Sequence, residues 1–137
     1  MLNFRNTDAW NALEKRLECF HLMIVSDLPS SIAVAYSSPN DVDKITATIK
    51  AAYEKTKVVI NGLRSDPNYN IGGNGDQMYA GVMSMHKDAV MSELSATLGV
   101  TADMLLPTLD LSRSLSDVAS RADSTYKQAV ANHHANA

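Results

Sequence analysis

The chain has 137 residues, of which 45% are hydrophobic and 20% are charged, and its formal net charge is -3. These values are typical of one globular domain, and they exclude a disordered chain and a general attraction to nucleic acid or anionic membranes. The single Cys19 excludes an internal disulfide, and no uncharged apolar run is long enough to cross a bilayer. The sequence therefore predicts one soluble, cytoplasmic domain over residues 1–137.

The first predicted helix begins near Thr7, whose hydroxyl suits a helix N-cap. Large apolar residues follow at spacings of three and four, which places them on one helical face: Trp10, Leu13, Leu17, Phe20 and Ile24. The stretch LPSSIAVAYSSP then interrupts the pattern. Its apolar centre, residues 32–36, fits a short helix or an extended segment, because five residues are too few to define a period.

The second predicted helix has a clear start, with Ser38 as N-cap and Pro39 at the first helical position. Gly62 favours an early end. The apolar stripe predicted to face inward consists of Val42, Ile45, Ile49, Ala52, Thr56, Ile60 and Leu63.

The third predicted helix covers residues 76–98, ends at Gly99 and is apolar nearly all round. We expect one side to face the other helices, through Met78, Val82, Met85 and Ala89. The neighbouring side then exceeds what one core requires, which favours self-association or a partner helix. The interface predicted on this side consists of Tyr79, Met83, Val90, Met91 and Leu94.

The last predicted helix follows Pro107 and directs six residues inward: Leu111, Leu115, Val118, Ala122, Thr125 and Ala129. Residues 1–6 and 132–137 are expected to fray. No alternating pattern suggests a sheet, and no internal repeat is visible. The predicted fold class is therefore all-α: a single-domain bundle of four main helices, with a Gly-rich loop between the second and third.

The Gly-rich loop, residues 65–77, reads SDPNYNIGGNGDQ. As a calcium loop starting at Asp66 it fails, because Ile71 replaces the required glycine and Gln77 replaces the bidentate carboxylate. As a phosphate loop it lacks the lysine that follows a P-loop. A helix connection is the favoured reading. Its length nevertheless makes Asn70, Ile71 and Asn74 a candidate contact surface, or a cover for a small-molecule pocket.

Residues 93–109, ELSATLGVTADMLLPTL, have the outline of a helix-turn-helix. The would-be recognition helix offers no Arg, Lys, Asn or Gln to read base edges, and Pro107 breaks it. The absence of nearby Lys or Arg also removes the main source of DNA affinity. A plain helix corner is favoured, which argues against nucleic acid as a partner.

The remaining polar residues give no catalytic or metal signature. His86 is expected to be partly exposed and inert. His133 and His134 are adjacent, so they point in different directions on a helix and cannot clamp a metal together. Cys19 and His21 lie two residues apart, which argues against a thiolate–imidazole couple. The sequence therefore predicts no enzyme, no metal and no cofactor.

Together these patterns favour a small non-catalytic helical binding protein, such as an adaptor, an inhibitor or an assembly component. It would act through helix–helix contacts with a protein partner or with itself, as a homodimer or larger species. Two alternatives remain open. One is a DNA-binding regulator that uses residues 93–109, and the other is a small-ligand sensor closed by the Gly-rich loop.

Overall fold

The computed structural model describes residues 4–36, 39–69, 71, 73–100 and 110–135. Within these ranges the chain is helical and contains no strand, so the all-α prediction is confirmed there. The elements in chain order are α1 (Phe4–Asp27), α2 (Pro29–Tyr36), the short 3-10 helix η1 (Pro39–Asp41), α3 (Val42–Ser65), α4 (Gly75–Leu98) and α6 (Leu111–Ala135).

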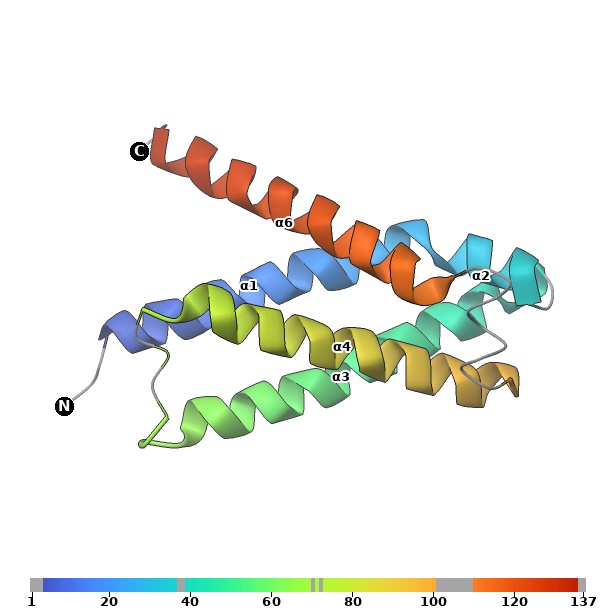
Figure 1. The fold of residues 1–137 in the computed structure, drawn as a ribbon, viewed down its shortest axis with the longest axis horizontal. Coiled ribbons are helices and arrows are strands. Elements are labelled where there is room, and N and C mark those ends of the chain that lie inside the picture. The colour runs from blue at the N-terminus through green and yellow to red at the C-terminus, as the bar shows by residue number, and fades with distance from the viewer. Residues whose placement is uncertain (1–3, 37–38, 70, 72, 101–109, 136–137) are drawn as a thin grey trace.

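The long helices lie alongside one another and pack mainly in two pairs (Figure 1). The α3 and α4 helices form the most extensive contact, followed by α1 and α6. The α1 helix also packs against α4 and, less extensively, against α3.

The stripe predicted on the first helix is confirmed. All five of its residues are buried, and Phe20 and Ile24 are 0% exposed. The stripe on α3 is confirmed as well, with Ile45, Ile49, Ala52, Thr56 and Ile60 buried and the two end positions half-buried.

The short segment that the sequence left open is helical. Pro29 begins α2, where a proline is tolerated because the first turn needs no internal N–H partner. Amide bonds from Leu28 to Ile24 and from Ile32 to Leu28, each 3.0 Å, carry the helical pattern across the junction with α1. In the described part of the chain no single helix combines the length and apolar composition needed to span a membrane, although α1 and α2 together, bent by 47°, meet both criteria.

The faces of α4 differ from the prediction. Tyr79, Val90 and Leu94, expected at an external interface, are buried in the core, while Met85, expected to face inward, is 39% exposed. Met83 and Met91 are half-buried against the core. The reason is that α4 packs against α1, α3 and α6 at once, so neighbours cover a broad arc of it. Much of the apolar surface that the sequence assigned to an external interface therefore lies inside the molecule.

The ends of α3 and α4 illustrate when glycine stops a helix. Gly62 does not end α3, which continues to Ser65, so the early stop was wrong. Gly99 does end α4 as predicted. It adopts φ +68°, a left-handed conformation that glycine takes without strain, and its amide bonds to the Ala96 carbonyl at 3.3 Å.

The last helix reaches beyond the packed region. Leu111, Leu115, Val118 and Ala122 are buried as predicted. Thr125 and Ala129, also expected to face inward, are exposed, because the C-terminal turns of α6 extend away from the other helices (Figure 1). The backbone is helical from residue 4 and up to residue 135, within both stretches that were expected to fray.

Candidate functional site

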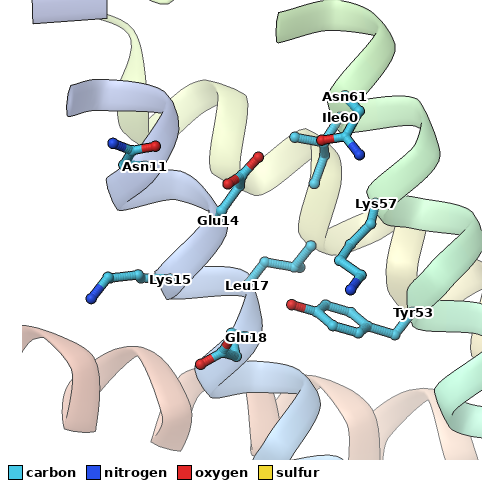
Figure 2. Close-up of a pocket in the computed structure, with 9 residues that line it drawn as sticks. All are labelled: Asn11, Glu14, Lys15, Leu17, Glu18, Tyr53, Lys57, Ile60 and Asn61. Atoms are coloured by element: carbon cyan, nitrogen blue, oxygen red, sulfur yellow. The ribbon is translucent and has the colours of Figure 1, made fainter. Parts of the chain in front are cut away.

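A groove of about 330 Å³ runs between α1 and α3 (Figure 2). Leu17 and Ile60, both 1% exposed, provide apolar surface at its base. The other lining residues are polar or charged: Asn11, Glu14, Lys15 and Glu18 from α1, and Tyr53, Lys57 and Asn61 from α3. Spacings of three and four set these residues along the facing flanks of the two helices. The groove is an apolar channel with charged rims.

Tyr53 lies beside Glu18, toward the end of the groove away from Asn11 and Asn61, and links the groove surface to the core (Figure 2). Its ring stacks on His21, with ring centroids 4.0 Å apart and planes 4° from parallel. The Lys57 ammonium lies 4.9 Å from the Tyr53 ring centroid, within the range of a cation–π interaction. Lys57 also forms an ion pair of 3.0 Å with Glu54, one helical turn away. One face of the Tyr53 ring is therefore already covered by a cation from the same helix.

The electrostatic environment of the Tyr53 hydroxyl is negative. Burial, together with the negative charges of Glu18, Glu14 and Glu54, raises its pKa to about 12. At neutral pH the hydroxyl is therefore protonated and can donate a hydrogen bond, but it cannot act as a base. Carboxylates from both helices favour a positively charged group beside this ring.

One end of the groove is bridged by Arg64, near the C-terminus of α3. Its Nη1 donates to Glu14 Oε2 at 3.0 Å, and its Nη2 donates to Asn11 Oδ1 at 2.6 Å. Arg64 and Glu14 are 50 residues apart in the chain, so their bond joins α3 to α1 and holds the two rims of the groove at a fixed separation at this end.

Two histidines lie behind Tyr53, in the interior. His86 is 0% exposed and His21 is 5% exposed, with ring centroids 5.6 Å apart. The pKa of each is lowered to about 4, mainly by burial and, for His21, also by the positive charges of Lys50 and Lys57. Within the described residues neither nitrogen of His86 has a hydrogen-bond partner. The expectation of a partly exposed His86 was wrong, and its position one turn from Val82 and Val90 on the buried stripe was the sequence signal for burial.

The loop residues named from the sequence have three different outcomes. Ile71 is 1% exposed and belongs to the core, so its assignment to a contact surface was wrong. Asn74 is exposed. Asn70 lies outside the described residues. The Tyr69 ring is 6.2 Å from that of Trp10, and its hydroxyl donates to the Met78 sulfur at 3.5 Å. Apolar side chains thus tie the described part of this loop to the helices, and a recess of about 280 Å³ lies beside it.

A second recess of about 330 Å³ lies where α1, α4 and α6 meet. Met83, one of the residues predicted at an interface, lines it together with Arg16, Tyr79 and Asp123. Arg16 is engaged by Asp123 and by Asp76, and its guanidinium lies 4.0 Å from the Tyr79 ring centroid. Its charge is therefore satisfied within the molecule.

Two sequence hypotheses concern other parts of the chain. Most of the second half of the helix-turn-helix, residues 101–109, lies outside the described residues, as do the side chains of His133 and His134. In the first half, Glu93 pairs with Lys55 on α3. Within the described ranges, no group of three or more His, Cys, Asp or Glu residues is arranged to hold a metal ion.

No protein-family model matches this chain, and no curated protein or solved structure shows significant similarity to it.

Proposed function

We propose that this chain is a small, non-catalytic helical binding protein that holds a basic segment of a partner protein in the α1–α3 groove. It would serve as an adaptor, an inhibitor or an assembly component of the cytoplasm. We further propose that α1, α3, α4 and α6 are the four main helices of a single domain over residues 1–137, with the Gly-rich loop joining α3 to α4.

The observation that carries the proposal is the environment of Tyr53. Glu14, Glu18 and Glu54 all act on its hydroxyl, and Lys57 already lies over its ring. A partner lysine or arginine could replace Lys57 on the ring and pair with Glu18, and with Glu54 once Lys57 is displaced. Apolar surface at Leu17 and Ile60 would pack against the stem of that side chain. Helix-in-groove binding uses this combination of apolar channel and charged rim.

The protonation states of the aromatic groups at the groove support the proposed non-catalytic role. The Tyr53 hydroxyl, with a pKa of about 12, is not a base at neutral pH. The imidazoles of His21 and His86 lie behind it in the core, where burial keeps them uncharged. These groups support binding better than proton transfer.

The other hypotheses have less support. Self-association through the predicted face of α4 would require Val90 and Leu94 at the surface, and both are 0% exposed. A regulator that binds DNA would depend on residues 101–109. A small-ligand sensor would depend on the recess of about 280 Å³ beside the loop, where Ile71 is already inserted in the core.

The test is the binding of a labelled amphipathic peptide with lysines on one face, measured by fluorescence anisotropy at low and moderate salt. A peptide with glutamate in place of each lysine is the ligand control. Glu18→Lys should weaken binding of the basic peptide by about tenfold or more, because it reverses a charge at the groove. Asp88→Lys makes the same charge change at an exposed position of α4 and should have little effect.

Two results would reject the proposal. In one, the wild type does not distinguish the basic peptide from the acidic one. In the other, Glu18→Lys and Asp88→Lys weaken binding equally, which would indicate general charge attraction with no role for the groove.

A further inference from the structure

The paired histidines in the core are titratable groups that do not line the groove. His21 on α1 and His86 on α4 meet where α3 contributes Tyr53. The Phe20 ring contacts His86 edge-on at 5.6 Å. Aromatic rings from α1 and α3 thus flank two imidazoles that are almost completely shielded from solvent.

The surroundings of the pair favour the neutral form of both rings. The charged groups that act on His21 all come from α3: Lys50 and Lys57 oppose a positive imidazole, and Glu54 favours it more weakly. The group that acts on His86 is His21 itself. In the described part of the chain, no carboxylate forms an ion pair with either ring, so a proton arriving here would create a buried charge without a partner.

We propose that His21 and His86 form an acid-operated release, in which protonation of either imidazole destabilises the packing of α1, α3 and α4 and thereby dismantles the groove at Tyr53. The coupling is direct, because the ring of Tyr53 that lines the groove is the same ring that stacks on His21. The device goes beyond the binding proposal and operates whether or not the groove holds a partner.

The direction and the pH window follow from linkage. Each histidine has a pKa of about 4 in the folded protein, against an ordinary value of 6.5. Between these values the unfolded chain binds more protons than the folded one, so stability falls as the pH falls from 6.5 to 4. Above this window both states are neutral, and below it both are protonated. From pH 7 to pH 5, one such histidine lowers the folding equilibrium constant roughly 20-fold.

Urea unfolding at pH 7 and pH 5 tests the device. We expect the wild type to lose much more stability between the two values than His86→Phe, whose ring keeps the aromatic packing and cannot be protonated. His21→Phe should behave in the same way, since it keeps the stack on Tyr53. His133→Phe removes a histidine outside the pair and should retain the full wild-type loss. If His86→Phe and His21→Phe both lose as much stability as the wild type, the device is refuted.

A second measurement works even if the phenylalanine variants fail to fold. The imidazole C–H signals of the wild type can be followed by NMR from pH 7.5 downwards. Two of the four histidines should remain neutral in the folded state until the tertiary signals disappear, and the disappearance should fall within the window above. If all four titrate near 6.5 in the folded protein, the pair is not shielded and the proposal fails. Neither measurement needs a ligand, so a failed peptide experiment leaves this test intact.

Discussion

Arg16 on α1 and Asp123 on α6 form a bidentate ion pair between residues 107 positions apart in the chain, with Nε–Oδ1 at 2.5 Å and Nη2–Oδ2 at 2.8 Å. The remaining Nη1 of Arg16 donates to Asp76 at 2.8 Å, and the guanidinium lies over the Tyr79 ring on α4. One side chain thereby connects three helices. Because its fork is largely shielded from water, this contact contributes more than an ordinary surface pair.

Asp123→Asn should therefore destabilise the protein. Its carboxylate is 23% exposed and the Arg16 side chain 14%, so the substitution leaves a partly buried guanidinium short of one partner, at a cost of about 1–3 kcal/mol. Asp76→Asn is the matched control, because that side chain is 91% exposed and its pair is screened by water. The free energies come from urea unfolding at neutral pH. Equal effects at the two positions would contradict the assigned role.

The same pair should respond to strong acid. The hydrogen bonds from Arg16 lower the pKa of Asp123 below its ordinary value of 3.8. The ion pair therefore contributes its full stability above that value and loses it as the pH falls through the lower folded pKa. Asp123→Asn should flatten the stability profile below about pH 4 and leave the range from pH 6.5 to 4 unchanged. A changed slope in that higher range would show that Asp123 also influences the histidine pair.

Tyr79→Phe should be neutral or stabilising. The Tyr79 hydroxyl is buried without a hydrogen-bond partner among the described residues, and burial raises its pKa to about 12. Phenylalanine keeps the ring under Arg16 and removes an unsatisfied polar group, with an expected gain of up to about 1 kcal/mol. The gain should increase above pH 10, where the unfolded tyrosine ionises and the folded one does not. Thermal melts at pH 7 and pH 10.5 provide the measurement, and a clear loss of Tm at pH 7 would count against this reading.

Ile71→Ala should cost about 2–4 kcal/mol, although the residue lies in a connection between helices. The side chain is 1% exposed and packs in the core, so its truncation leaves a cavity. Asn74→Ala in the same loop is exposed and should change stability by less than about 0.5 kcal/mol. Chemical denaturation of both variants gives their free energies of unfolding. A small effect of Ile71→Ala would mean that the loop does not anchor the helices.

Glutamate substitutions on α4 should distinguish its buried face from its exposed face. Val90→Glu places a carboxylate at a position that is 0% exposed and should unfold the chain at room temperature. Met85→Glu puts the same group at a position that is 39% exposed and should leave the helical circular dichroism and the melting temperature nearly unchanged. The opposite order of effects would restore the assignment of faces made from the sequence.

The sequence predicted those parts of the fold that depend on local pattern. The stripe from Trp10 to Ile24 is periodic and bounded by polar residues, so only one face of that helix could be buried. Gly99 ends α4 because the chain adopts a left-handed conformation at that residue. Gly62 could adopt the same conformation, but the chain stays helical there and α3 continues to Ser65. A glycine therefore ends a helix only where the chain turns into the left-handed conformation.

The parts that escaped prediction depend on contacts between distant residues. A helix that is apolar all round, such as α4, does not encode which side its neighbours cover. The placement of Met85 and Val90 is therefore decided by α1, α3 and α6. The groove at Tyr53 likewise requires knowing that α1 and α3 lie side by side. The burial of His86 escaped for the same reason, because its place one turn from Val82 and Val90 indicates burial only once the covered side of α4 is known.

The last turns of α6 have a practical consequence for protein engineering. Thr125 and Ala129 are exposed, and the helix continues to residue 135 with its last turns directed away from the other helices (Figure 1). An alanine-rich helix spliced in phase onto this end would extend the same axis at about 1.5 Å per residue, so a fused reporter would sit at a direction and distance chosen by the number of added residues. The chain thereby provides a rigid mount for imaging or for display, with the α1–α3 groove left open.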